Sequence, residues 1–289
     1  MKRGLRNYGY IGILLIILVE ISIVFNLTDV TRWATPIAWT GYILLIDSII
    51  FRLKKQSLII SRTKEFLVIL LLSIGFWLIF DGYNLFLRNW YYINLPSELW
   101  LRWIGYAWAF ATITPGIFET TELLETLNLF SRGSLKQRRV ARKTLIFLIF
   151  VGVTFLICPL VCSKYANYMA ALVWAGFIFL LDPLNYMLGT KSILRDWEEG
   201  RISRFLSLCC AGFICGILWE FWNFWAYTKW IYTIPVVEII KIFEMPILGY
   251  IGFPALALEL YVMYNFARIS KTKISQAFLR FKVFTRGFQ

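Results

Sequence analysis

The sequence predicts an all-α integral membrane protein, a polytopic bundle of eight transmembrane helices. Of its 289 residues, 59% are hydrophobic and only 16% are charged, whereas soluble proteins carry about 25% charged residues. Eight apolar segments are long enough to cross the roughly 30 Å hydrocarbon core, which takes about 20 mostly apolar residues. Most basic residues lie between these segments, as in proteins whose cytoplasmic loops are rich in Lys and Arg.

The eight predicted spans follow one another along the chain. The first one comes after the basic start MKRGLR, but it contains Glu20 and lacks a small-residue cleavage site, so we expect a retained helix rather than a signal peptide. The spans are residues 8–26, 34–51, 66–86, 104–123, 144–163, 167–188, 205–224 and 246–267.

The positions of the basic residues predict that both termini are cytoplasmic. With that orientation, 24 of the 30 Lys and Arg residues lie on the inner side, in agreement with the positive-inside rule. We therefore expect a multi-pass protein of the cell membrane, which is the inner membrane if the source is bacterial. The six outer basic residues are Arg32, Arg88, Arg102, Lys164, Lys229 and Lys241. The outer loops also carry an aromatic belt: Trp90, Tyr91, Tyr92, Trp100, Trp103, Trp225, Tyr227, Trp230 and Tyr232.

Two blocks of sequence recur, which predicts an internal duplication. The block WTGYILLIDSII at 39–50 matches WAGFIFLLDPLN at 174–185, with a shift of 135 positions that places Asp47 on Asp182. The block IFDGYNLFLRNWYYINLP at 79–96 matches LWEFWNFWAYTKWIYTIP at 218–235, with a shift of 139 positions. The second shift also matches Asp81 with Glu220, Asn84 with Asn223, Arg102 with Lys241, and Pro115 with Pro254.

The duplication predicts four regions. Residues 1–126 and 144–268 form two four-helix repeats, which are parallel because each has an even number of spans. Residues 127–143 form a basic cytoplasmic linker, and 269–289 form a basic amphipathic tail that lies on anionic lipid. An ordinary cytoplasmic tail, or a helix packed on the bundle, is the alternative for the last region.

The chain contains no His, and this excludes several kinds of metal and catalytic site. The absence of His excludes His-ligated haem, His-containing zinc sites and Ser-His-Asp hydrolysis within this chain. The five Cys lie inside apolar runs, where packing is their expected role. We therefore expect no cofactor and no metal. We also expect no nucleic-acid partner, because the net charge of +13 is spread between apolar runs rather than along one face.

Ionisable groups inside spans are costly and indicate functional sites. Our candidate catalytic residues are Glu220, Glu259, Asp81 and Asp182. The candidate substrate-binding residues are Asn84, Asn223, Pro115, Pro254, Trp219 and Trp222. Two polar layers are expected, an outer one with Glu20, Asp81, Asn84, Glu220 and Asn223, and an inner one with Asp47, Asp182, Glu119 and Glu259.

Structural roles remain open for several of these residues. Asp81 with Arg102, and Glu220 with Lys241, have the spacing of ion pairs that would pin neighbouring helices. Asp47 and Asp182 could cap inner helix ends, and Glu244 is expected to begin a helix and to be structural. The two matched prolines either open their helices at a binding site or only kink them.

The segments GFICGILWEFWNFW and GYIGFPALALELY each bring small residues close to an intramembrane Glu. In this respect the chain resembles the duplicated lycopene cyclase domain of bacterial and archaeal carotenoid synthesis. The resemblance implies an isoprenoid substrate, with Glu220 and Glu259 as proton donors. The Pro-x-Glu-Glu signature of that family is not reproduced, and four spans per repeat exceed its usual number.

Three functions fit the sequence. The preferred one is a cofactor-free enzyme or carrier for a hydrophobic isoprenoid or lipid, with protonated buried carboxyls as acids. The alternatives are a proton-coupled secondary transporter and a non-catalytic subunit of a membrane complex. Membrane lipids and a hydrophobic small molecule are the expected partners, and protein partners stay open.

Overall fold

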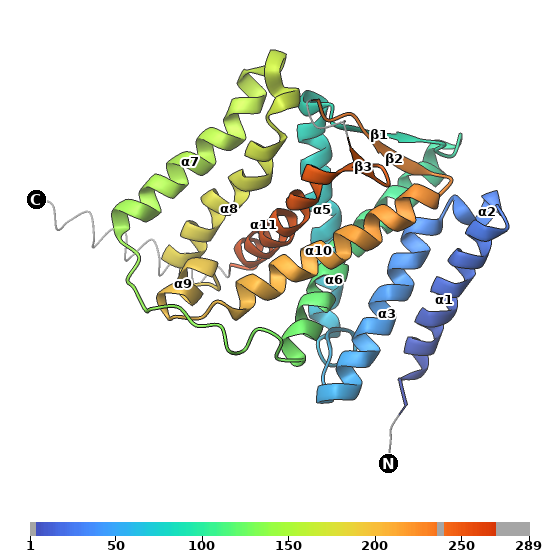
Figure 1. The fold of residues 1–289 in the computed structure, drawn as a ribbon, viewed down its shortest axis with the longest axis horizontal. Helices are drawn as coiled ribbons and strands as arrows, with labels where there is room; N and C mark the ends of the chain where they lie inside the picture. The colour runs from blue at the N-terminus through green and yellow to red at the C-terminus, as the bar shows by residue number, and fades with distance from the viewer. Residues whose placement is uncertain (1–3, 236–239, 270–289) are drawn as a thin grey trace, which may run out of the picture.

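The computed structural model describes residues 4–235 and 240–269 and is dominated by long helices (Figure 1). The described long helices are α1 (Asn7–Val24), α3 (Ala34–Lys54), α5 (Thr63–Leu87), α6 (Leu99–Thr126), α7 (Arg142–Val161), α8 (Ala170–Met187), α10 (Ser203–Trp225) and α11 (Gly252–Ala267). Short helices connect them: α2 (Thr28–Thr31), α4 (Leu58–Ser61), α9 (Ile193–Glu198) and the 3₁₀ segments η1 (Ser163–Tyr168) and η2 (Ile247–Ile251). The strands are β1 (Trp90–Ile93), β2 (Lys229–Tyr232), β3 (Lys241–Ile242) and β4 (Met245–Pro246).

Seven helical segments of the described chain are long and apolar enough to cross a membrane, namely α1, α3, α5, α7, α8, α10 and the continuous segment Ile247–Ala267. This confirms the prediction of a multi-pass integral membrane protein. The remaining predicted span, 104–123, lies within α6, which is long but is not one of the seven. Its Thr, Trp and Gly residues make it less apolar, and it packs between α3, α5 and α10.

The helices of the two halves pack in the same order. In the first half α1 contacts α3, α3 contacts α6, and α6 contacts α5. In the second half α7 contacts α8, α8 contacts α11, and α11 contacts α10. The α1–α3 and α7–α8 pairs lie at opposite sides of the bundle (Figure 1), and contact between α6 and α10 joins the halves.

Glycines allow the outer helix pairs to approach closely. A Cβ added to Gly12 on α1 would lie 2.5 Å from the carbonyl oxygen of Gly41 on α3. A Cβ added to Gly152 on α7 would collide with the backbone of Leu180 on α8, and Gly176 leaves room there for Leu156. Small residues at helix contacts are a common device of membrane bundles, because close backbone packing is a main source of helix association in lipid.

A two-stranded antiparallel ribbon covers one end of the bundle. Strand β1 follows α5 and strand β2 follows α10, so the ribbon ties the two halves together (Figure 1). Trp90 pairs with Tyr232, and Tyr92 pairs with Trp230. The sequence predicted an aromatic belt in these two loops and no strand. The predicted amphipathic tail, residues 269–289, lies outside the described residues from position 270 on.

The glycine contacts give a first test. Gly152→Leu is expected to lower the free energy of unfolding by about 1–3 kcal/mol or more, because the new side chain meets the backbone of α8 rather than a movable side chain. Thermal unfolding in mild detergent measures the effect. Gly75→Leu is the matched control, since Gly75 is exposed on α5 with nothing within 4 Å of an added Cβ. Equal stability of the two variants would contradict the assigned α7–α8 contact.

Candidate functional site

Two acidic side chains anchor the ribbon to the helices. The Trp90 indole Nε1 and the Tyr92 hydroxyl each donate to Oδ1 of Asp81, both at 3.0 Å. On the other side, the Tyr232 hydroxyl donates to Oε1 of Glu220 at 2.8 Å. Each acid therefore binds the strand that follows its own helix, α5 for Asp81 and α10 for Glu220.

Two asparagines fix the backbone of the same strands. The Asn84 amide donates to the Trp90 carbonyl oxygen at 2.7 Å and accepts from the Asn89 backbone N–H at 2.8 Å. The Asn223 amide donates to the Trp230 carbonyl oxygen at 2.9 Å and accepts from the Trp230 N–H at 3.0 Å. These bonds satisfy backbone groups that would otherwise lack partners at a helix-to-strand junction.

Four of the five residues predicted for the outer polar layer thus hold the ribbon rather than forming ion pairs: Asp81, Asn84, Glu220 and Asn223. Glu220 and Asn223 are fully buried, and Asp81 and Asn84 are partly buried. Among the described residues neither acid pairs with the base once considered for it: the Arg102 Nε donates to the Pro96 carbonyl oxygen at 3.0 Å, and Lys241 is exposed in β3.

The two ribbon tyrosines are hydrogen-bond donors at neutral pH. Burial is the main cause that raises the pKa of the Tyr92 hydroxyl well above its ordinary value, and the neighbouring Asp81 carboxylate is the second cause. Burial, followed by the Glu220 carboxylate, does the same to the pKa of Tyr232. Both hydroxyls therefore stay protonated and carry the proton that bonds each carboxyl.

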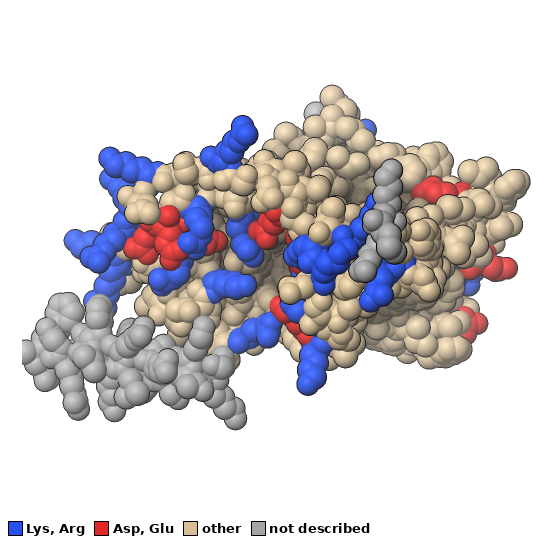
Figure 2. All heavy atoms as spheres, turned by 90° about the horizontal axis from the view of Figure 1, so that it is seen from below, with Lys and Arg blue, Asp and Glu red and all other residues tan. Residues whose placement is uncertain are grey.

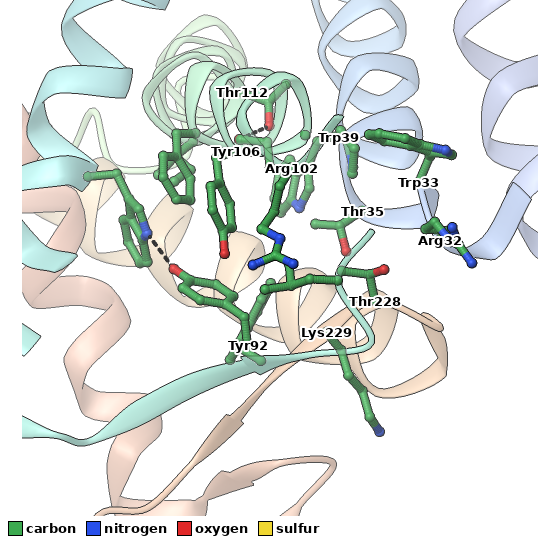
Figure 3. A pocket seen from close by; sticks show the side chains of 18 of the residues that line it. Arg32, Trp33, Thr35, Trp39, Tyr92, Arg102, Tyr106, Thr112, Thr228 and Lys229 are labelled. Atoms are coloured by element: carbon green, nitrogen blue, oxygen red, sulfur yellow. Dashed lines mark hydrogen bonds between the residues drawn. The ribbon is translucent and has the colours of Figure 1, made fainter. Parts of the chain in front are cut away.

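Beneath the ribbon lies cavity 1, which encloses about 750 Å³ of space including its mouth. It lies among α3, α6, α10 and the ribbon, and its walls are mostly aromatic. Figure 3 shows the Arg102 guanidinium reaching into its middle, between Tyr92 and Thr35. The lining side chains include Trp33, Trp39, Trp77, Tyr92, Tyr106, Phe110, Trp219 and Trp230, with the cations Arg32, Arg102 and Lys229.

Cavity 2 lies on the other side of the same aromatic wall and encloses about 1400 Å³ including its mouth. Trp77, Tyr92, Trp219 and Trp230 line both cavities. No charged side chain of the described chain lines cavity 2. Its other lining residues include Asn89, Trp90, Trp174, Tyr232, Met245, Leu248, Gly249, Gly252, Phe253 and Leu256.

The two cavities are built from matching positions of the two halves. Trp39 of cavity 1 corresponds to Trp174 of cavity 2, at the shift of 135 positions. Phe110 corresponds to Gly249 and Ile113 to Gly252, at the shift of 139 positions. Glycine in place of Phe and Ile explains why cavity 2 is the larger one.

The inner acids Asp47 and Asp182 cap short helices. Asp182 accepts the backbone N–H groups of Ile193 at 2.7 Å and Leu194 at 2.9 Å, at the start of α9. Asp47 accepts the backbone N–H of Ile59 at 2.8 Å and the Tyr8 hydroxyl at 2.7 Å. Both carboxyl oxygens of each acid are thereby occupied, and the capping alternative describes these two residues.

Glu119 on α6 and Glu259 on α11 are different, because they are fully buried and neither carboxyl oxygen has a hydrogen-bond partner in the described chain. An isolated charge at such a place is so costly that the neutral acid is expected. Neither residue lines cavity 1 or cavity 2. Glu259 therefore does not lie where a molecule in either cavity would meet it.

The two prolines differ in setting. Pro115 lies within α6, where the Ser73 hydroxyl of α5 inserts beside it, donating to the Phe110 carbonyl oxygen at 2.5 Å and accepting from the Thr114 N–H at 3.0 Å. The Ser73 hydroxyl thus packs against the turn that contains Pro115, where a proline is expected to kink a helix. Pro254 is the third residue of α11, where its missing N–H costs little. Pro254 thus lies inside the segment Ile247–Ala267, close to the junction of η2 and α11, and its role in a binding site stays a prediction.

The remaining predicted residues, Trp219, Trp222 and Glu244, have different positions relative to the two cavities. Trp219 lines both cavities. Trp222 lines neither cavity but packs against Trp39 of cavity 1, and it donates from Nε1 to Oε1 of Glu20 at 2.9 Å, which ties α10 to α1. Glu244 precedes β4 rather than a helix, and its Oε1 forms an ion pair with Lys229 at 2.7 Å. Its expected position was wrong, and its ion pair gives it a structural role.

Sequence reasoning did not assign the ribbon aromatics Trp90, Tyr92, Trp230 and Tyr232 to the site, nor the cation Arg102. A signal was present, because the order acid, Trp, Tyr occurs in both halves, with the aromatic residues one position farther from the acid in the second half: Asp81, Trp90, Tyr92 and Glu220, Trp230, Tyr232. Comparison with protein-family models, with curated proteins and with solved structures finds no match to this chain.

Within residues 4–235 and 240–269 no three His, Cys, Asp or Glu side chains gather closely enough to hold a metal ion.

The asparagine bonds give a second test. Asn223→Ala is expected to cost about 1–3 kcal/mol of unfolding free energy, because it leaves the Trp230 N–H and C=O groups without their partner. Asn7→Ala, at an exposed position at the start of α1, is the control and is expected to change little. Thermal unfolding measures both. A silent Asn223→Ala would show that the ribbon is not held by this side chain.

Proposed function

We propose that the chain crosses the membrane eight times, as two parallel four-helix repeats, with α6 as the eighth span. The identical packing order of the two halves and the paired glycine contacts support this arrangement. The register of the ribbon supports it too. Tyr91 pairs with Ile231, and on either side of this pair the Trp of one strand lies opposite the Tyr of the other strand. A two-fold axis between equivalent strands produces this register.

We also propose that both termini are cytoplasmic. Figure 2 shows Lys and Arg side chains spread over the end of the bundle opposite the ribbon, where α4 and α9 lie. Several of these bases pair there with acids, among them Lys54 and Arg62 with Glu122, and Arg204 with Glu125. The positive-inside rule then places the ribbon on the outer side.

Within this frame we propose that the protein binds a hydrophobic molecule, a lipid or an isoprenoid, in cavity 2 and acts on it as a carrier or an enzyme. The observation that carries the proposal is cavity 2 itself, with about 1400 Å³ of space including its mouth, its aromatic lining and its lack of charged lining residues in the described chain. Ligand sites are typically concave, mostly apolar cavities with a few convergent polar groups. The polar groups here are the Asn89 amide and the Tyr232 hydroxyl.

The contact between Tyr232 and Glu220 favours the enzyme over the carrier. Tyr232 lines cavity 2 and its hydroxyl donates a hydrogen bond to Glu220, while Oε2 of Glu220 is buried without a partner in the described chain. When Glu220 is protonated, Tyr232 can give its hydroxyl proton to a molecule in the cavity and take up the carboxyl proton of Glu220, so one proton passes along the pair without any cofactor. Asp81 with Tyr92 forms the corresponding pair in the first repeat.

Filling cavity 2 tests the binding proposal. Gly252 lines the cavity, has helical backbone angles, and has nothing within 4 Å of an added Cβ. Gly252→Leu is therefore expected to fold normally and to lose the retained molecule. We would extract each protein in mild detergent and quantify co-purifying lipid-soluble molecules by mass spectrometry. Gly75→Leu makes the same change on the exposed face of α5 and should retain them.

Two outcomes would contradict the binding proposal. One is wild-type protein that carries only the phospholipids found with an unrelated multi-pass protein. The other is an enriched molecule that Gly252→Leu retains as well as Gly75→Leu does.

A further substitution separates enzyme from carrier. Glu220→Gln removes the acid while keeping a group that can accept from Tyr232. An enzyme would then retain unconverted substrate in the variant and substrate with product in the wild type, and mass spectrometry distinguishes these. The Asn7→Ala protein serves as the control. The same molecule in the same amount in both proteins would contradict a proton-transfer role for Glu220.

A further inference from the structure

Cavity 1 differs from cavity 2 in its charge. Three of its lining residues are cations, Arg32, Arg102 and Lys229, and none of its described lining residues is acidic. They are three of the six basic residues that lie on the ribbon side of the bundle. Because the positive-inside rule disfavours bases on that side, their gathering at one cavity calls for a specific reason.

Arg102 is the cation directed at the cavity. Its Nε donates to the Pro96 carbonyl oxygen at 3.0 Å, and no described residue forms a hydrogen bond with its two terminal nitrogens. Figure 3 shows this guanidinium in the middle of the cavity, whereas the Lys229 ammonium points away from it. Lys229 is held by Glu244, with 2.7 Å between Nζ and Oε1. Arg102 also lies in the first turn of α6, where the helix dipole favours an anion.

Three buried groups in the same wall lack hydrogen-bond partners within the described chain: the Nε of Arg32, the hydroxyl of Thr35 and the indole Nε1 of Trp39. All three can donate a hydrogen bond. Buried donors are rarely left without an acceptor, because the loss costs free energy. The Arg32 guanidinium also lies over the Tyr227 ring, 5.6 Å from its centroid. Figure 3 shows Thr35 beside the Arg102 guanidinium, and the Thr35 hydroxyl and the terminal nitrogens of Arg102 are donors that an oxygen-rich anion would satisfy.

We propose that cavity 1 binds the phosphate headgroup of a membrane lipid. The donors match several phosphate oxygens, and guanidinium is suited to phosphate by its planar fork. Arg32 precedes α3 and Arg102 begins α6, so both lie at the end of the bundle near the proposed outer membrane surface, where lipid phosphates are found. The aromatic walls below them, such as Tyr106 and Phe110, face the apolar part of the lipid.

This inference concerns a site separate from cavity 2, so each can fail alone. We would measure binding of dioleoyl phosphatidic acid, dioleoylglycerol, oleate and inorganic phosphate to protein in a neutral detergent by native mass spectrometry. Wild type is expected to bind phosphatidic acid about tenfold more tightly than dioleoylglycerol. Arg102→Gln is expected to lose most of that preference while binding dioleoylglycerol as before. Arg88→Gln, an exposed arginine that lies outside the cavity lining, should keep it.

Several results would overturn the proposal. Equal affinity for phosphatidic acid and dioleoylglycerol would remove the headgroup site, and so would equal losses for both lipids in Arg102→Gln. Displacement of phosphatidic acid by inorganic phosphate at similar concentration would assign the site to free phosphate, and tighter binding of oleate would assign it to a carboxylate. If Arg102→Gln fails to fold, Arg32→Gln tests the same preference. Gly252→Leu, which fills cavity 2, should leave the preference unchanged.

Discussion

The contact on which the site depends is the anchoring of the β1–β2 ribbon by buried polar side chains of α5 and α10. A two-stranded ribbon alone is at best marginally stable in water, and here Asp81 and Glu220 bind its side chains while Asn84 and Asn223 bind its backbone. The ribbon joins the halves at one end, and its Tyr92 and Trp230 form the wall between the two cavities together with Trp77 of α5 and Trp219 of α10. An acid inside a span is costly unless it finds partners, and the ribbon supplies them.

The two halves share one helix arrangement but form different cavities. Matching positions place Trp39 and Trp174 in equivalent walls, yet Phe110 and Ile113 narrow cavity 1 where Gly249 and Gly252 widen cavity 2. The bases divide in the same way, since Arg102 reaches into cavity 1 whereas its counterpart Lys241 is exposed in β3. A few different side chains on the same helix order thus give one apolar and one basic cavity.

The spans were predictable because crossing a membrane demands about 20 apolar residues, a constraint that single residues seldom override. The repeated blocks made it predictable that Asp81 and Glu220 occupy corresponding positions in the two halves. The partners of these acids were not, because the short segment Trp90–Ile93 carries no strand pattern that separates it from an interfacial aromatic belt. Position along the chain also suggested Arg102 as a partner for Asp81, but the ribbon aromatics follow Asp81 more closely and occupy its carboxyl. The 3₁₀ segment before Pro254 was not predictable, because such a segment has no distinct sequence signature.

The most direct measurement of the role of the ribbon and its cavities is a cryo-electron microscopy map of the protein extracted from its own membrane in mild detergent. The expected map shows the ribbon closed over α5 and α10, with continuous density for an elongated molecule along the Trp174 wall of cavity 2. A map in which side chains fill this cavity, or in which the ribbon is displaced from Asp81 and Glu220, would contradict a binding function built on the ribbon.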